Sequence, residues 1–239
     1  MINKVIVAAA GRGTRMLHHS QDKPKHLIEI NGKPFLYYLL NKLKEAGFKE
    51  IIMVIGYQQK IMKEVLNKFE DQFPVTVVNQ FSRLKDKYGT ACPIECIEQE
   101  INKENFVAVC GDNLWSVADL KSIMIDDNLN YLAGFFSEHP EKYGVLITDE
   151  NDYLINIKEK PQEFAGNLIN AGLYKFTPEI FSKIALTKKS IRGEYELTDA
   201  INLLAHEKKV KVKKINDYWL DFGKPDDISV VSKFLKNNK

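Results

Sequence analysis

The chain has 239 residues, in which 34 lysines and arginines nearly balance 32 aspartates and glutamates and leave a formal net charge of +2. A chain of this length buries about 70% of its unfolded surface, so it needs neither a metal nor a disulfide for stability. The balanced charge provides no global field to attract nucleic acid, so no nucleic-acid partner is expected.

The three cysteines are Cys92, Cys96 and Cys110, and they lack paired Cys-x-x-Cys spacing. Neither a disulfide framework nor a zinc site is therefore predicted. The N-terminal segment lacks the cleavage region of a signal peptide, and no apolar run is long enough to cross a membrane. We expect a cytoplasmic protein without a membrane partner.

The first 55 residues predict a β-α-β unit. The apolar run from Lys4 to Ala10 is typical of a strand that is buried on both faces of a parallel sheet. Pro34 marks a helix start, Gly47 marks its end, and residues 51–55 form a second buried strand. Beyond it we expect helices at 58–69 and 89–101, strands at 75–78 and 106–110, and an irregular segment at 79–88.

From residue 130 the pattern changes to short strands with polar connections. Strands are expected at 131–136, 145–148, 154–157, 168–176 and 210–215, and helices at 178–186, 197–207 and 225–236. Short strands joined by turns are typical of antiparallel pairing. This region therefore predicts a largely antiparallel insertion rather than a separate domain.

The loop after the first strand is suited to phosphate. Gly11 and Gly13 let the backbone approach an anion, and successive N–H groups in such a turn form an anion-binding nest. Arg15 and Lys25 add positive charge nearby. A dinucleotide fingerprint would need glycine at Met16, and the P-loop spacing is also absent, so both classes are disfavoured. The alternative is an ordinary β-α turn with solvated basic side chains.

The segment Ala-Ala-Gly-x-Gly-Thr-Arg-Met, from Ala9 to Met16, followed by Lys23-Pro-Lys25, resembles the signature of sugar-1-phosphate nucleotidylyltransferases, or NDP-sugar pyrophosphorylases. The resemblance covers about residues 1–230, and nothing resembles the hexapeptide β-helix that some relatives append. It implies an α/β fold with a Rossmann-like mixed, mainly parallel central sheet, helices on both faces and a smaller antiparallel sugar-binding insertion. One domain, 1–239, would combine a nucleotide-binding half at 1–128 with a sugar-binding half at 129–239.

The resemblance also implies roles for individual residues on the nucleotide. Arg15 and Lys25 would be catalytic and contact the phosphates. The nucleotide-binding residues would be Ala9, Ala10, Gly11, Gly13, Thr14, Gln80, Gly89 and Thr90. Gln80 would offer its amide to a base edge, and Gly89 would let the base lie against backbone. Taken alone, Gly-Thr-Ala at this place is as readily a helix start.

Two aspartates match the magnesium ligands of the family. Asp112 lies in Gly-Asp-Asn, and Asp221 lies in the late Trp-x-Asp-x-Gly motif. Carboxylates are the hard oxygen ligands that Mg²⁺ uses together with substrate phosphates. The alternative for Asp112 is a helix cap. Phe222 departs from the small residue often found there, which puts the local packing in question.

Four later segments resemble the elements that enclose the sugar phosphate: Tyr143-Gly-Val, Glu159-Lys-Pro, Asn170-Ala-Gly and Gly193-Glu-x-Glu-Leu-Thr-Asp. The residues that they supply would be Gly144, Glu159, Lys160, Asn170 and Glu194. Glu159 and Asn170 can bond hydroxyls, and Lys160 can balance the phosphate charge. Each segment alone is more often a strand end, and the last one can equally supply a helix cap at Thr198.

The resemblance implies a magnesium-dependent transfer from a nucleoside triphosphate, with UTP favoured, to a hexose 1-phosphate, releasing pyrophosphate. No protein base is needed, because a phosphate monoester has a second pKa near ~6. The same reaction with dTTP, CTP or GTP is an alternative. A non-catalytic regulatory subunit that binds these ligands is another, and a homo-oligomer is possible.

Overall fold

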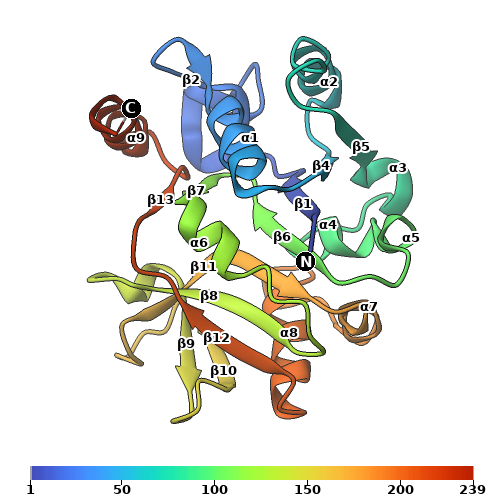
Figure 1. Cartoon of the computed structure of the whole chain (residues 1–239), viewed down its shortest axis with the longest axis vertical. Helices are drawn as coiled ribbons and strands as arrows, with labels where there is room; N and C mark the ends of the chain where they lie inside the picture. Colours follow the sequence, from blue (N-terminus) through green and yellow to red (C-terminus); the bar gives the residue numbers. More distant parts are fainter. Residues whose placement is uncertain (1, 239) are drawn as a thin grey trace.

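The computed structural model describes residues 2–238. Nine strands within that range belong to one mixed sheet (Figure 1). They are β1 (Lys4–Ala9), β4 (Glu50–Ile55), β5 (Val75–Asn79), β6 (Phe106–Cys110), β8 (Asn130–Phe136), β9 (Gly144–Thr148), β10 (Leu154–Glu159), β11 (Leu168–Phe176) and β12 (Val210–Lys214). Two small sheets pair β2 (Glu29–Ile30) with β3 (Lys33–Pro34), and β7 (Asn113–Trp115) with β13 (Trp219–Asp221).

The main sheet runs in the order β10-β9-β11-β6-β1-β4-β5, with β8 beside β11 and β12 beside β8. Strands β6, β1, β4 and β5 are mutually parallel. Val5 and Val7 of β1 enter one hydrophobic cluster, whereas Ile6 between them enters the other. A strand that feeds two cores must be apolar at every position. The predicted doubly buried first strand is confirmed.

The helices are α1 (Phe35–Ala46), α2 (Gln59–Asn67), α3 (Gln80–Leu84), α4 (Cys92–Glu95), α5 (Glu98–Ile101), α6 (Val117–Ser122), α7 (Glu179–Ile184), α8 (Leu197–His206) and α9 (Asp226–Asn237). Short 3-10 turns are η1 (Thr14–Ser20), η2 (Lys25–Leu27) and η3 (Pro140–Lys142). Gly47 ends α1 with φ 101°, and its N–H donates to the carbonyls of Leu43 and Lys44. This is the predicted glycine stop, since the left-handed conformation favours glycine.

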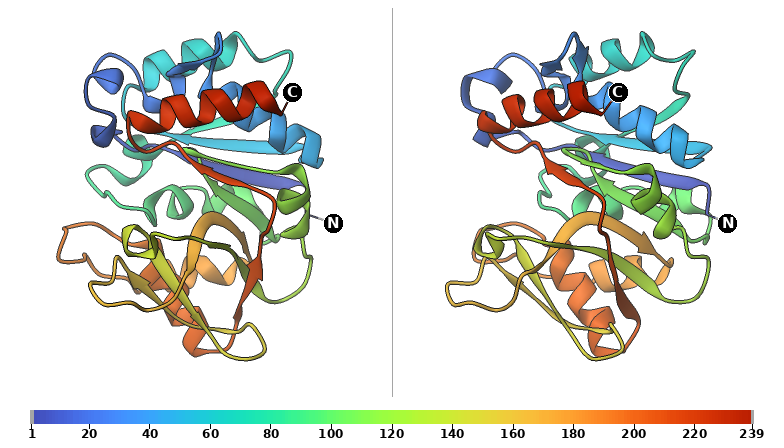
Figure 2. Two further views of the ribbon diagram at one scale, coloured as in Figure 1. Left: turned by 90° about the vertical axis from the view of Figure 1, so that its left-hand side faces the viewer. Right: turned by 60° about the vertical axis from the view of Figure 1, so that its left-hand side comes forward.

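The second half of the chain extends the same sheet. β11 pairs antiparallel with β6 on one side and with β8 on the other. Figure 2 shows the two halves one above the other, with the C-terminal segment crossing from the lower half to the upper. α9 then lies beside β2, where the Asn31 amide donates to the Ser232 carbonyl. The last part of the sequence therefore returns to the N-terminal half.

Two predictions between residues 79 and 101 are wrong. The segment expected to be irregular contains α3, which begins at Gln80 because the preceding Asn79 caps it and accepts the Ser82 N–H at 2.9 Å. The single helix expected up to Ile101 is broken into α4 and α5. Arg83 of α3 donates to the Cys96 carbonyl at 2.5 Å, which takes that carbonyl out of a continuous helix.

The short elements α6 and β7 were not predicted. Within residues 2–238, no helix is both long enough and apolar enough to pass through a bilayer.

Candidate active site

The carboxyl ends of β1, β4 and β6 meet at closely packed glycine-bearing loops. The Gly111 N–H donates to the Ala8 carbonyl at 2.9 Å, and a Cβ on Gly111 would lie 2.8 Å from that oxygen. A Cβ on Gly56 would lie 2.8 Å from the carbonyl of Ala10. Such approaches exclude any side chain. This is the edge of an open α/β sheet at which ligands bind.

The loop after β1 folds over the side chain of Lys25. Gly13 has φ 66°, and a Cβ there would lie 3.3 Å from the Cβ of Lys25. The Gly13 carbonyl accepts hydrogen bonds from the Met16 N–H at 2.9 Å and the Ser20 hydroxyl at 2.8 Å. Gly11 differs, because a Cβ there would meet nothing within 4 Å. Backbone at Gly11 thus borders open space where an anion can approach.

Lys25 and Asp112, predicted for different ligands, form an ion pair with each other. Their side chains are 11% and 20% exposed, so the pair is largely shielded from water. Lys25 opens η2 after Pro24, whereas Asp112 follows β6. The structure therefore brings together the phosphate loop and the predicted metal ligand.

Asp221 reaches the same place through the two-stranded sheet. β13 pairs antiparallel with β7 and places Asp221 opposite Asn113. The Asn113 amide donates to Asp221 Oδ1 at 3.1 Å, and the Phe222 N–H donates to the Asp112 carbonyl at 2.8 Å. Phe222 is fully buried and stacks on Phe35 with ring centroids 4.3 Å apart. The departure at Phe222 therefore anchors β13 to α1.

The surroundings move the pKa values of the two aspartates in opposite directions. Burial alone would raise the pKa of Asp112, but the charge and hydrogen bond of Lys25 outweigh burial and lower it. Burial raises the pKa of Asp221 to about 6, with the charges of Asp112 and Asp227 adding to the effect. The two pKa values separate because the ion pair with Lys25 favours the charged form of Asp112, whereas burial beside other carboxylates disfavours the charged form of Asp221.

The donor set fits a magnesium ion that is shared with a substrate. No group of three or more His, Cys, Asp or Glu side chains that could hold a metal occurs in residues 2–238. Mg²⁺, however, is usually bound by one or two carboxylates together with substrate phosphates and water. Asp112 and Asp221 supply that number, and the ammonium of Lys25 already stands in for a cation at Asp112.

Of the residues expected around the base, Gly89 and Thr90 lie where the two halves meet, whereas Gln80 donates to the Lys87 carbonyl within the first half. Gln80 is 1% exposed, and its Oε1 has no hydrogen-bond partner within residues 2–238. A Cβ on Gly89 would lie 2.2 Å from the carbonyl oxygen of Tyr195, so this glycine lets two backbones pack closely. Thr90 Oγ1 accepts the Leu197 N–H at 2.8 Å. Gly89 and Thr90 thus connect the nucleotide half to the sugar half.

The sugar-side residues converge on adjacent strands. β10 pairs with β9 and sets Glu159 opposite Gly144. From the position of a Cβ on Gly144, Glu159 Oε2 lies at 3.2 Å and the Cβ of Asn170 at 3.8 Å. Lys160 is exposed with φ 42°, and its N–H donates to the Tyr143 carbonyl at 3.0 Å. No ion pair fixes its ammonium among the described residues.

Sequence reasoning missed an arginine and a glutamate on this side. Glu196 is buried and accepts from Arg192 at 2.9 Å, and Arg192 also lies 3.9 Å from Glu159 Oε1. The predicted Glu194 is half-buried in the same segment, and its carbonyl accepts the Ser190 N–H. The sequence did offer a signal, because Arg192 lies four residues before Glu196 in a segment that already resembled a sugar-binding element.

Arg12, in the nucleotide loop, is a third missed residue. Its guanidinium lies 5.7 Å from the ring centroid of Tyr88, the residue before Gly89. The contact joins two loops predicted to flank the nucleotide. Arg12 occupies the variable position between Gly11 and Gly13, which is why the motif alone did not single it out.

Comparisons with known proteins show the family and the fold. The family model described as Nucleotidyl transferase matches residues 4–238. UTP–glucose-1-phosphate uridylyltransferase AglF of Haloferax volcanii is 32% identical over 235 residues, which cover 94% of this chain and 93% of the relative.

A bifunctional sugar-1-phosphate nucleotidylyltransferase/acetyltransferase of Sulfurisphaera tokodaii is 33% identical, and the match covers 98% of this chain but 56% of the relative. The chain thus spans about half the length of such bifunctional relatives. A crystal structure of UDP-glucose pyrophosphorylase complexed with UDP-glucose has a TM-score of 0.87 at 24% identity, with all of both chains covered. At that identity the likeness shows the fold.

Proposed function

The chain belongs to the nucleotidyl transferase family as a sugar-1-phosphate nucleotidylyltransferase, and we propose that it joins UTP to a hexose 1-phosphate and releases pyrophosphate. One observation carries the proposal. Lys25, Asp112 and Asp221 come from three distant parts of the sequence and converge at the carboxyl edge of the sheet. That edge lies between a phosphate-type loop and strands with sugar-binding groups.

The proposed reaction is one in-line displacement. An oxygen of the sugar phosphate forms a bond to the α-phosphorus while the bond from that phosphorus to the bridging oxygen breaks, and pyrophosphate leaves. The attacking monoester has a second pKa near ~6 and needs no protein base. Catalysis then consists of positioning and charge stabilisation.

On the nucleotide side, Arg15 holds the departing phosphates, and Lys25 neutralises charge at the α-phosphate. Arg15 is exposed, and one of its guanidinium nitrogens lies 3.5 Å from the position of a Cβ on Gly223, two residues after Asp221. Asp112 and Asp221 would hold Mg²⁺, which when bound supplies positive charge to the phosphates. Ala9, Ala10, Gly11, Gly13 and Thr14 provide the backbone of the phosphate loop.

On the sugar side, Glu159 and Glu194 accept hydrogen bonds from sugar hydroxyls, and the Asn170 amide can accept or donate. Gly144 leaves room beside Glu159, because a Cβ at this position would lie 3.2 Å from Glu159 Oε2. Lys160 carries an ammonium without an ion-pair partner among residues 2–238 and steers the phosphate of the acceptor. An exposed lysine with no fixed partner among residues 2–238 suits a group that must follow a mobile anion.

The preference for UTP is supported by Gln80. Its buried Oε1 lacks a partner within the described residues, so a ring N–H of a base would satisfy it. Uracil and thymine carry such an N–H at N3 and guanine carries one at N1, whereas neutral cytosine does not, so the contact separates UTP from CTP and not from GTP. A thymine methyl changes binding by only about 1–3 kcal/mol in a fitted pocket, so dTTP is the nearest competitor.

The test is a matrix of four triphosphates against a set of hexose 1-phosphates, with pyrophosphate release as the readout. We expect release only when both substrates and Mg²⁺ are present, and fastest release with UTP. Triphosphate hydrolysis that is independent of sugar phosphate would contradict the transfer reaction. Binding of both ligands without turnover would support a regulatory subunit instead.

A further inference from the structure

Lys25 and Asp112 are ion-pair partners in this structure. The ammonium expected on a phosphate and the carboxylate expected on a cation are joined by an ion pair and hydrogen bond. The ammonium cannot bind a phosphate, and the carboxylate cannot bind a cation, while the two groups remain paired with each other. The pair must therefore exchange partners whenever the site is loaded.

Packing against Gly13 holds the Lys25 side chain so that its ammonium lies at Asp112. From the position of a Cβ on Gly13, the Cβ, Cγ and Cδ atoms of Lys25 lie at 3.3, 3.4 and 3.5 Å, so the lysine stem runs along this glycine. The Ser20 hydroxyl bonds the Gly13 carbonyl and fixes that wall. Lys25 as a whole is 9% exposed. Only the end of its side chain is therefore able to choose between partners.

The surrounding groups leave room for one strong cation position. His26 is 2% exposed beside Lys25, and burial, followed by the charge of Lys25, lowers its pKa to about 3. The imidazole is therefore neutral at physiological pH. Asp221 faces Asp112 with Asn113 as its hydrogen-bond donor. The ammonium of Lys25 pairs with Asp112, and the charges of Lys25 and of the exposed Arg15 act on Asp221 without an ion pair among the described residues.

We infer that Lys25 is the resident counter-ion of Asp112 and competes with a divalent cation for that carboxylate. The inference rests on the proposed function in so far as it assigns magnesium to this position. A cation that arrives alone must leave a largely buried ammonium without a partner, which is costly. A cation that arrives with a triphosphate brings oxygens that receive the ammonium. Metal is therefore bound weakly without nucleotide and firmly with it.

The test measures Mn²⁺ binding to the nucleotide-free protein from the loss of the free-ion electron paramagnetic resonance signal. Lys25→Met should bind Mn²⁺ about ten- to hundredfold more tightly than the unmodified protein, because a hydrogen bond to a charged group no longer competes. Lys25→Arg keeps the charge and should bind as weakly as the unmodified protein. Lys25→Gln repeats the neutral variant with a polar group in case methionine prevents folding.

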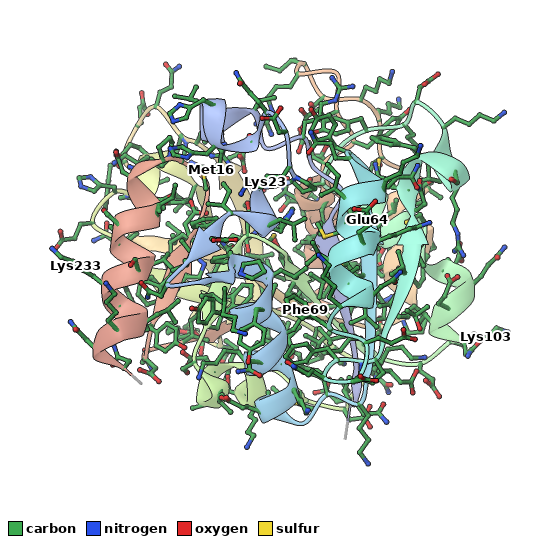
Figure 3. The ribbon with its side chains drawn as sticks, turned by 90° about the horizontal axis from the view of Figure 1, so that it is seen from above. Met16, Lys23, Glu64, Phe69, Lys103 and Lys233 are labelled. Atoms are coloured by element: carbon green, nitrogen blue, oxygen red, sulfur yellow. The ribbon has the colours of Figure 1, made fainter. Side chains whose placement is uncertain are left out.

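The matched control is Lys23→Met. Figure 3 shows Lys23 in the same segment, near Met16 and, in this view, between the helices that carry Lys233 and Glu64. The Lys23→Met substitution removes the same charge but leaves the ion pair of Asp112 intact, so the affinity for Mn²⁺ should change by less than about twofold. Adding Asp112→Asn to Lys25→Met should abolish the gain.

Unchanged Mn²⁺ affinity in both neutral Lys25 variants would overturn the inference, as would an equal gain in Lys23→Met. The substrate matrix on the unmodified protein separates this result from the proposed function. Transfer activity with unchanged affinities contradicts the exchange alone. A large gain in Lys25→Met without any transfer activity in the unmodified protein contradicts the proposed reaction alone.

Discussion

The two sides of the candidate site differ in how their charged groups are held. On the nucleotide side, Lys25 and Asp112 have side chains only 11% and 20% exposed and are paired with each other. On the sugar side, Glu159 and Arg192 have side chains 40% and 44% exposed and lie 3.9 Å apart, at the limit of an ion pair. The charged pair on the nucleotide side is therefore shielded from water, whereas the contact between Glu159 and Arg192 is partly exposed, although Arg192 also bonds the buried Glu196 at 2.9 Å.

This difference has a physical meaning for catalysis and for choice of substrate. Buried charges interact strongly because water screens them little, so small displacements there change the reaction. Exposed charges interact weakly and can adapt to different partners. We therefore assign the chemistry to the nucleotide side and sugar discrimination to the sugar side. The four predictions below test that division, beginning with the largest expected effect.

Asp112→Asn should lower kcat by at least about a hundredfold, since removing a charge group in a closed site costs on the order of 3 kcal/mol. Asp221→Asn should also impair turnover, and both variants should need more Mg²⁺. The double variant should be little worse than the poorer single one, because ligands of one metal act as a unit. Magnesium titrations of activity provide the measurement. Asp217→Asn, an exposed residue near β13, is the control and should be normal.

Lys160→Ala should raise KM for the sugar phosphate by about tenfold with a smaller change in kcat, because a charged hydrogen bond to the acceptor phosphate is lost. Steady-state kinetics at saturating triphosphate measure this. Lys158→Ala removes an exposed lysine two residues earlier on β10 and should leave KM unchanged. Equal effects in the two variants would mean that only the general charge of the region matters.

Gln80→Leu should reduce the preference for UTP over CTP by about tenfold while leaving the magnesium requirement unchanged, because it removes the buried amide oxygen. The ratio of kcat/KM for the two triphosphates is the measurement. A uniform loss with all triphosphates, at constant preference, would place Gln80 in the scaffold instead.

Asp221→Asn should raise stability by about 1 kcal/mol at pH 7.5, because the carboxylate has a folded pKa of about 6, above its ordinary value of 3.8. The raised pKa therefore costs stability in full above about pH 6, and the cost is lost as the pH falls from about 6 to the ordinary value of 3.8. In metal-free buffer, the melting temperature should rise by about 2–4 °C at pH 7.5 and by less at pH 4.5. An equal gain at both pH values would exclude titration of Asp221 as the cause.

The sequence by itself determined the elements whose causes are local. The apolar run of β1, the helix stop at Gly47 and the glycine-bearing loop follow from hydrophobic pattern and backbone constraints that a few residues contain. The motif resemblance also led to the family, which the comparisons confirm. The assigned roles of Gln80, Lys160 and the other site residues remain predictions.

Only the tertiary structure decided which charged groups meet. Nothing local in the sequence pairs Lys25 with Asp112, joins Thr90 to Leu197, or places Asp221 opposite Asn113 on β7. These contacts depend on strand register and on loops that return from distant parts of the chain. Local propensity reports the conformation of a segment, whereas the partner of a buried charge is set by the packing of the whole sheet, which minimises unpaired charge in the interior.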